Sequence, residues 1–130
     1  MKIKITSNIK EIEKILKKHW GKKASKKKCV KPDYKILVIY SENKEEVDGF
    51  LYAYDINDGY FHWCILDDLH VKEKFNKEIS EKLIGKLIDY CKKEKIESIE
   101  YDLTGDKKTV RELFKKSGFS IEKETKTTAS

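Results

Sequence analysis

The sequence has 130 residues, which is room for one domain, because hydrophobic cores organise in units of roughly 100 to 150 residues. Hydrophobic residues make up 38% of it and aromatic residues 11%, enough for a packed core, so disorder of the whole chain is excluded. The formal net charge of +6 comes from lysine, since Arg111 is the only arginine, and lysine suits diffuse attraction to polyanions better than the reading of specific bases.

The spacing of the cysteines and the hydropathy of the sequence indicate whether the protein has a metal site and where in the cell it is located. Cys29, Cys64 and Cys91 are odd in number and widely spaced, and no two of them form a CxxC pair. This pattern indicates neither a disulfide framework nor a zinc site. The sequence has no apolar signal core near its start and no run that approaches the roughly 18 apolar residues of a membrane span. We therefore expect a cytoplasmic protein that binds no metal and no membrane.

The first predicted elements are a short strand and an amphipathic helix. Residues 2–6 alternate between polar and apolar, and Asn8 then precedes a run of helical periodicity, with Glu11 placed to complete a capping box. Residues 21–31, GKKASKKKCVK, have no apolar period and many like charges, which predicts a basic loop that ends at Pro32. In the predicted helix, Ile9, Ile12 and Leu16 recur at helical spacing.

Three β-rich runs follow, over residues 34–40, 47–56 and 60–71. The polar run SENKEE separates the first two, and the turn sequence of residues 57–59, Asn-Asp-Gly, separates the second from the third. The three runs predict an antiparallel meander. The meander has a concentration of aromatic residues that is expected mostly in the core, formed by Tyr52, Tyr54, Tyr60, Phe61 and Trp63.

The longest predicted helix follows a suitable cap at Asn76 and keeps its apolar residues on one face as far as Cys91. Residues 98–103 then read as a strand, so we expect a strand-helix-strand crossover with parallel pairing. A last helix stops at Gly118, and a final strand leads to residue 125, after which residues 126–130 are expected to fray. These elements predict one α/β domain over residues 1–125.

The order strand, helix, three-strand meander, helix, strand, helix and strand resembles the GNAT family of N-acetyltransferases. Residues 49–71, GFLYAYDINDGYFHWCILDDLHV, are similar to the glycine-phenylalanine strand and the acidic (E/D)-D-L-x-V strand of polyamine-type members. Residues 113–119, LFKKSGF, are similar to the family's LYxKxGF ending. The resemblance spans nearly the whole chain and implies a mixed α/β (α+β) fold, with a mostly antiparallel sheet of about six strands flanked by three to four helices.

The resemblance also implies a site for acetyl-CoA. In the family, the strand equivalent to residues 69–71 diverges from its neighbour and pairs with the pantetheine arm, and the pyrophosphate rests on the following loop and helix N-terminus. Here this segment is VKEKFNKEIS, residues 71–80, in which lysines replace a glycine-rich loop as the neutralising groups. The residues implied to bind acetyl-CoA are Leu69, His70, Val71, Phe75, Asn76, Lys77, Ile79, Ser80, Lys107 and Phe114.

The implied reaction is direct transfer of acetyl from acetyl-CoA to a primary amine of a small molecule or a protein, which needs a base for the ammonium proton. Asp67 matches the family's catalytic acidic position, and Asp68 beside it is expected on the opposite face of the strand. Tyr52 and Tyr54 share one face and are predicted to bind the substrate cation by cation-π attraction. Phe114 replaces the tyrosine that serves as the family's acid.

Because phenylalanine has no proton to donate, water, Tyr101 or Cys64 is left to protonate the departing thiolate. His62 and Cys64 also share a strand face, which is one mark of nucleophilic catalysis. No third group in the sequence is evident that would orient the histidine, so structural packing is the favoured interpretation of this pair.

An inactive, GNAT-shaped binding module is the alternative function, because the loop glycines and the family's tyrosine are absent. Its partner would be an acidic protein or a nucleic acid that binds the basic loop from Lys22 to Lys28. In the enzyme hypothesis the partners are acetyl-CoA and an amine, and the chain is a monomer or a homodimer.

Overall fold

The computed structural model describes residues 2–20, 34–43, 46–71, 76–96, 98–101, 107–117 and 120–124. Some predictions from the sequence lie outside these residues: the basic loop over residues 21–31, the loop position Phe75, the helix stop at Gly118, and the fraying of residues 126–130. Every predicted strand and helix is described at least in part.

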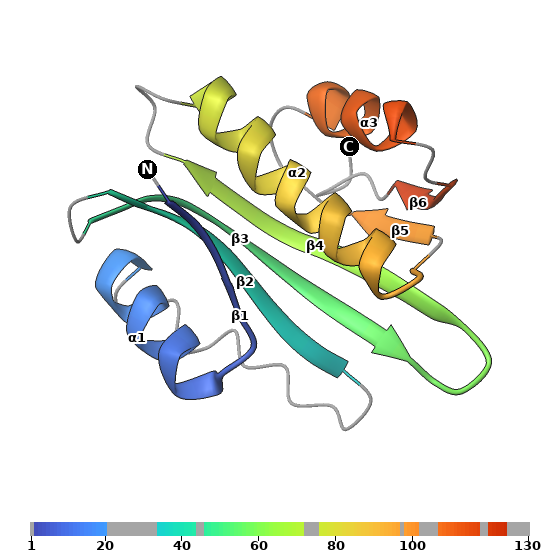
Figure 1. The fold of residues 1–130 in the computed structure, drawn as a ribbon, viewed down its shortest axis with the longest axis horizontal. Helices are drawn as coiled ribbons and strands as arrows, with labels where there is room; N and C mark the ends of the chain where they lie inside the picture. Colours follow the sequence, from blue (N-terminus) through green and yellow to red (C-terminus); the bar gives the residue numbers. More distant parts are fainter. Residues whose placement is uncertain are drawn as a thin grey trace, which may run out of the picture.

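Six strands form one sheet, and they are β1 (Lys2–Thr6), β2 (Tyr34–Asn43), β3 (Glu46–Asn57), β4 (His62–Val71), β5 (Ser98–Tyr101) and β6 (Ser120–Glu124). They lie side by side in chain order (Figure 1). The strands from β1 to β4 pair antiparallel, which confirms the predicted meander. The pairs β4–β5 and β5–β6 are parallel, so the predicted crossover between β4 and β5 is confirmed as well.

Three helices cover the two faces of this sheet. α1 (Ile9–Trp20) lies on one face, while α2 (Asn76–Lys93) and α3 (Lys107–Lys116) lie together on the other (Figure 1). Among the described residues the fold is therefore a mixed, mostly antiparallel sheet of six strands with three helices, as predicted. None of the helices described is long and apolar enough to cross a membrane.

Each face of the sheet carries its own buried cluster, and we name the faces after their helices. On the α2 face, Leu83 and Phe114 from the helices pack with strand residues such as Leu51. On the α1 face, Ile12 packs with strand residues such as Tyr52. The two clusters follow from strand alternation, because successive residues of β2 and β3 point to opposite faces and both faces are covered.

The N-terminus of α1 is capped by Asn8, whose Oδ1 accepts the N–H groups of Lys10 (3.0 Å) and Glu11 (3.2 Å). The predicted capping box is wrong. The N–H of Asn8 donates to Thr6 Oγ1 (3.1 Å), and the Glu11 carboxylate instead accepts the hydroxyls of Thr6 and Tyr40, both at 3.0 Å. Glu11 therefore joins α1 to β1 and β2.

The turn between β3 and β4 corrects a second expectation. Tyr60 and Phe61 are 90% and 72% exposed, although the sequence placed them mostly in the core. β4 begins only at His62, and the Asp58 carboxylate holds the turn by accepting the N–H groups of Phe61 (2.7 Å) and Tyr60 (2.9 Å). These hydrogen bonds also lower the pKa of Asp58.

Gly49 of β3 lies directly beneath the first turns of α2, and it gives the first testable prediction. A Cβ at this position would stand 2.9 Å from Ile79 Cγ2 and 3.1 Å from both the His70 carbonyl oxygen and Val71 Cγ2. We expect Gly49→Ala to lower the free energy of unfolding by about 1–3 kcal/mol, because the helix must move away from the sheet. Urea denaturation followed by circular dichroism measures this change.

Gly85 in the middle of α2 is the matched control, because a Cβ there would meet no atom within 4 Å. We expect Gly85→Ala to stabilise the protein by about 0.5–1 kcal/mol through its helix propensity. Equal effects of the two substitutions would contradict the close packing inferred at Gly49.

Candidate functional site

A β-bulge interrupts β4 at Asp67. Across the β3–β4 pair, Tyr52 lies opposite Asp68 and Ala53 lies opposite Leu66, so Asp67 is the extra residue. Strand alternation from buried Leu66 puts Asp67 on the α1 face, and the register puts Asp68 there with Tyr52. The expectation that the two carboxylates point to opposite faces is therefore wrong, because the bulge breaks the alternation between them.

The described pairing of β4 with β5 reaches the residue just before the bulge. Their parallel register runs from Trp63 opposite Ser98 to Leu66 opposite Tyr101, while β4 itself continues to Val71. The residues after Tyr101, 102–106, lie outside the described residues. In general, an unpaired strand edge presents backbone N–H and C=O groups in the pattern with which an extended ligand can pair.

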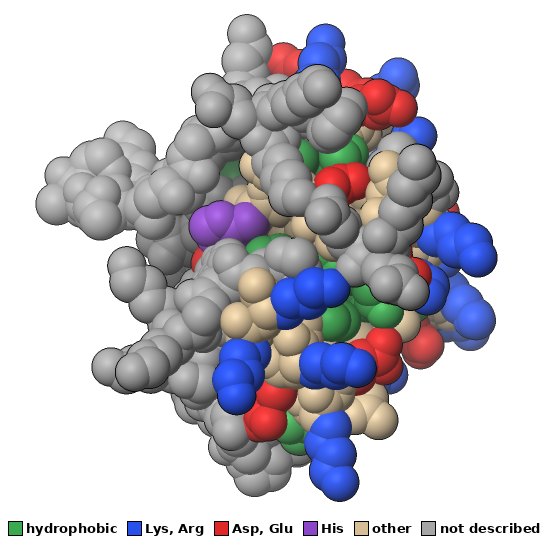
Figure 2. Space-filling model, turned by 90° about the vertical axis from the view of Figure 1, so that its left-hand side faces the viewer, with side chains coloured by type: hydrophobic (Ala, Val, Ile, Leu, Met, Phe, Trp, Pro, Cys, Tyr) green, Lys and Arg blue, Asp and Glu red, His purple; other side chains and the backbone are tan. Residues whose placement is uncertain are grey.

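Asp68 and His70 form a polar pair on the α1 face beyond the bulge. His70 Nε2 lies 2.9 Å from Asp68 Oδ1, which also accepts the Leu69 N–H at 3.1 Å. The imidazole ring stacks on Phe50, with 5.4 Å between ring centroids and 24° between planes. The His70 side chain is 49% exposed and that of Asp68 20%. Figure 2 shows this end of the molecule, where a histidine and several lysines reach the surface.

The pairing of His70 with Asp68 was missed by the sequence reasoning, which assigned His70 to acetyl-CoA alone. A usable signal was present, because residues i and i+2 of a strand share a face. Leu69 and Val71, the neighbours of His70, behave differently and pack against the cluster of the α2 face. Side chains of the predicted cofactor strand therefore divide between the two faces, as alternation requires.

Tyr52 and Tyr54, the predicted substrate-binding residues, share the α1 face, as expected. Their rings meet edge to face at 5.4 Å between centroids, and Tyr54 also contacts Tyr34 at 5.6 Å. Both are buried, with 2% and 8% exposed. In the structure they form the wall of the sheet beside Asp68, and they present little ring surface to solvent.

The N-terminus of α2 follows β4 after residues 72–75, which lie outside the described residues together with the side chain of Asn76. Ile79 and Ser80 are buried against the sheet, whereas Lys77 is exposed. The carboxylate of Glu78, an anion beside the expected phosphate position, is paired with Lys82 Nζ at 3.2 Å. The first-turn N–H groups, the positive end of the helix dipole and Lys77 together fit an anionic group such as a pyrophosphate.

The remaining predicted residues lie on or near α3 and β5. Lys107 begins α3, although its side chain lies outside the described residues, and Phe114 is fully buried on the α2 face. Tyr101, a predicted replacement acid, lies opposite Leu66 in the last described pair of β4 and β5 and is also fully buried. Cys64, the other replacement, is buried, and its contact with Cys91 and its burial raise the pKa of its thiol. This thiol is a poor nucleophile.

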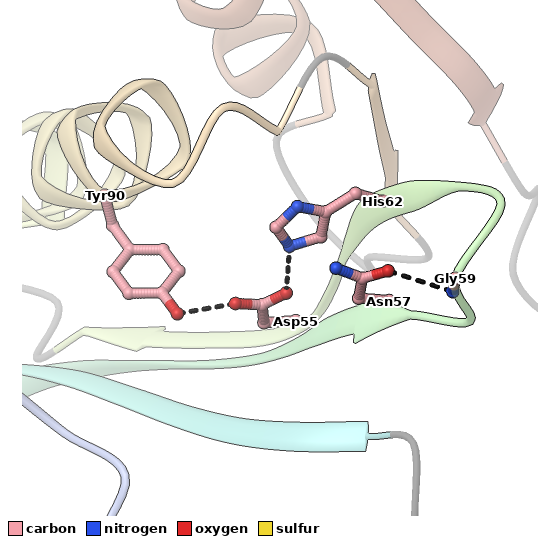
Figure 3. A network of polar contacts seen from close by, with 5 residues as sticks. All are labelled: Asp55, Asn57, Gly59, His62 and Tyr90. Atoms are coloured by element: carbon pink, nitrogen blue, oxygen red, sulfur yellow. Dashed lines mark hydrogen bonds and ion pairs between the residues drawn. The ribbon is translucent and has the colours of Figure 1, made fainter.

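His62 has an orienting partner, contrary to the prediction from sequence. Asp55 of β3 is 8% exposed, and its Oδ1 lies 2.6 Å from His62 Nε2 while its Oδ2 accepts the Tyr90 hydroxyl of α2 at 2.6 Å (Figure 3). The register puts Asp55 opposite Cys64, so all these groups lie on the α2 face. The network joins α2 to the β3–β4 hairpin at the end of the sheet away from the bulge.

Within the described residues, no group of three or more His, Cys, Asp and Glu side chains could hold a metal ion.

Comparisons with known proteins agree with this fold. Residues 6–119 match the model of the Acetyltransferase (GNAT) family. The structure of a ribosomal-protein-alanine N-acetyltransferase from Brucella melitensis biovar Abortus 2308 is similar with a TM-score of 0.61 at 13% sequence identity, over 89% of this chain and 90% of that chain. A sequence search of curated proteins gives no match.

Two aminoglycoside acetyltransferases are also similar in structure. One, from an uncultured soil metagenomic sample, has a TM-score of 0.58 at 12% identity, over 89% of this chain and 86% of that chain. The other, AAC(6')-Iy in complex with CoA, has a TM-score of 0.56 at 13% identity, over 92% of this chain and 91% of that chain. At these identities the likeness is one of fold.

Proposed function

Because the chain belongs to the Acetyltransferase (GNAT) family, we propose that it transfers an acetyl group from acetyl-CoA to a primary amine. The observation that carries the proposal is the bulge at Asp67, which brings the carboxylates of Asp67 and Asp68 onto one face of β4. Both carboxylates come directly before residues 69–71, where the family resemblance implies that the cofactor arm pairs.

Acetyl-CoA would supply the thioester, and the chain offers groups for each of its parts. The backbone of residues 69–71 would pair with the pantetheine arm. The N-terminus of α2 and Lys77 would hold the pyrophosphate, a role in which exposed lysines and helix N–H groups stand in for glycines. Pairing of Glu78 with Lys82 lessens the repulsion that this acid would otherwise exert on the phosphates.

The acceptor in this proposal is a cationic amine. Asp67 and Asp68 lie on the same face of β4, where their charges attract an ammonium group, and Asp67 stands at the position where the family resemblance implies a catalytic acidic residue. Phe114 has no proton to give and is buried, so water protonates the departing thiolate. The aminoglycosides and the ribosomal protein named for the similar structures suggest acceptors for a first panel, together with polyamines and lysine peptides.

Binding of acetyl-CoA is the first test. At a concentration about 100 times its dissociation constant, acetyl-CoA should raise the free energy of unfolding by about 2.7 kcal/mol, with a matching rise in melting temperature. We expect Lys77→Glu to weaken binding by about 3–10-fold in calorimetry, because a repelling charge replaces an attracting one at the phosphates. Lys93→Glu, the same change at the other end of α2, is the control and should leave the affinity unchanged.

Absence of any thermal shift with acetyl-CoA would contradict the proposal. A chain that instead binds nucleic acid or an acidic protein, in a manner that weakens with salt, would be the inactive binding module. Release of free thiol in the presence of the amine panel then measures transfer, and Asp67→Asn should lower kcat/KM by about 10–100-fold.

A further inference from the structure

We propose that His70 is the proton acceptor for the substrate amine and that Asp68 is its positioning residue, while Asp67 binds the ammonium charge. The inference rests on the proposed function. It assigns the proton transfer to a side chain that the sequence had placed only against acetyl-CoA.

The geometry holds His70 in a state suited to accept a proton. Its Nε2 lies 2.9 Å from Asp68 Oδ1. The oxygen of an ionised carboxylate accepts hydrogen bonds and cannot donate one, so the imidazole carries its proton on Nε2. The lone pair is then on Nδ1. The stacked Phe50 ring fixes the plane of the imidazole, and 49% of the His70 side chain is exposed to solvent.

The two carboxylates are less suited to this step. Carboxylates in model compounds titrate near pH 4 and imidazole near pH 6.5, and a general base works best when it titrates close to the working pH. Asp68 Oδ1 already accepts the Leu69 N–H and lies 2.9 Å from His70 Nε2. Asp67 sits at the bulge, where its charge can attract the ammonium group without accepting its proton.

The reaction balances with these groups and the thioester. The ammonium N–H bond breaks, and its proton goes to Nδ1 of His70. The freed amine lone pair forms the new C–N bond at the thioester carbonyl carbon, the C–S bond breaks, and CoA leaves as a thiolate that water protonates. The nitrogen of the new amide must lose one more proton. His70 first releases its proton to solvent, and the neutral imidazole then accepts this second proton and passes it to solvent in the same way.

Other charged and titratable groups lie near His70. On β3, Tyr52 is opposite Asp68, and Asp48 is two residues before Phe50. On β2, Tyr40 is opposite Phe50, and its hydroxyl is bound by Glu11 of α1. Burial, and then Glu11, raise the pKa of Tyr40 to about 12, so this phenol stays neutral throughout the range in which imidazoles titrate.

The test compares the pH dependence of acetyl transfer in four variants. We expect His70→Gln to lower kcat about 100-fold with little change in KM, and to remove the acidic limb of the kcat/KM profile. Asp68→Asn should lower kcat about 10-fold with little change in KM, because the imidazole loses the carboxylate that holds its tautomer and orientation. Asp67→Asn should act mainly by raising the KM of the amine. His70→Ala should regain activity when imidazole is added.

The chain supplies a matched control in its other histidine-aspartate pair. His62 is also bound by a carboxylate, but it lies on the opposite face of β4 and at the beginning of the strand, whereas His70 lies near its end. His62→Gln should leave kcat and the pH profile as they are. The assignment is overturned if His70→Gln keeps the acidic limb, or if Asp67→Asn is the variant that removes it.

The proposed function and this assignment fail in different experiments. A wild-type chain that transfers acetyl to none of the amines removes both. A wild-type chain that transfers acetyl, with a His70→Gln variant equally active, removes the assignment alone.

Discussion

Replacing Phe114 with alanine is expected to lower the free energy of unfolding by about 3–5 kcal/mol. The phenyl ring is fully buried in the cluster of the α2 face, where α3 packs on α2 and the sheet. Truncation removes the apolar area of the ring and leaves a cavity that the surrounding helices and strands can fill only in part. Chemical denaturation, with the midpoint and slope followed by circular dichroism, measures the loss.

Phe114→Leu is the control for this prediction. Leucine is apolar and fills most of the volume that the phenyl ring occupies, so the expected loss in the free energy of unfolding is about 1–2 kcal/mol. A loss below about 1 kcal/mol for Phe114→Ala would contradict the packing role, because even partial collapse of such a site costs more than that. The result matters for function, since the family's proton-donating tyrosine is expected at this position and the structure shows a core residue there.

Much of the fold was predictable because its signals are local. The apolar face from Ile79 to Cys91 defines α2, and a strand on each side of such a helix favours a parallel pair in one sheet. The turn residues before β4 and the strand alternation of β2 and β3 gave the antiparallel meander. Each of these features depends on residues within one or two elements.

The arrangement of the candidate site depended on features that alternation does not reveal. The bulge is one extra residue in β4, and Leu66 to Val71 reads as an ordinary strand unless its partner is known. With strict alternation the two carboxylates separate, and with the bulge they share a face. The pairing of Asp68 with His70 obeys alternation, so it could have been inferred.

The Asp55 network depends on contacts that are distant in sequence. Tyr90 is 35 residues from Asp55, and only the crossover through α2 brings its hydroxyl onto the strand. The orienting group of His62 is not evident from the sequence, because a single aspartate in a strand has no distinguishing spacing. Such contacts follow from the assembled fold.

Replacing Asp55 with alanine is the last prediction, with an expected loss of about 2–4 kcal/mol in the free energy of unfolding. The carboxylate is largely buried and binds His62 and Tyr90, each at 2.6 Å, so its removal leaves two partly buried polar groups without their acceptor. Hydrogen bonds to a charged partner contribute about 1.5–3 kcal/mol each, and access of water to the two donors recovers part of the loss.

Asp55→Asn separates charge from shape, because the amide still accepts a hydrogen bond from the Tyr90 hydroxyl and should cost about half as much. A double-mutant cycle with Tyr90→Phe should give a coupling energy of about 1–2 kcal/mol. Burial, and then Asp55, raise the pKa of Tyr90 above that of an unfolded tyrosine. The contribution of Tyr90 is therefore complete below about pH 10 and is lost as the pH rises further.

A stability of Asp55→Ala close to that of the wild type would show that the network adds nothing to the fold. The His62 pair would then be free for a chemical role, and it would no longer serve as the structural control for His70. The expected result assigns the two histidines of β4 that pair with aspartates to different tasks. The His62 side chain is 25% exposed and its partner Asp55 binds Tyr90 of α2, so this pair holds the helix to the hairpin. The pair at His70, whose side chain is 49% exposed, is the one that we propose acts on substrate.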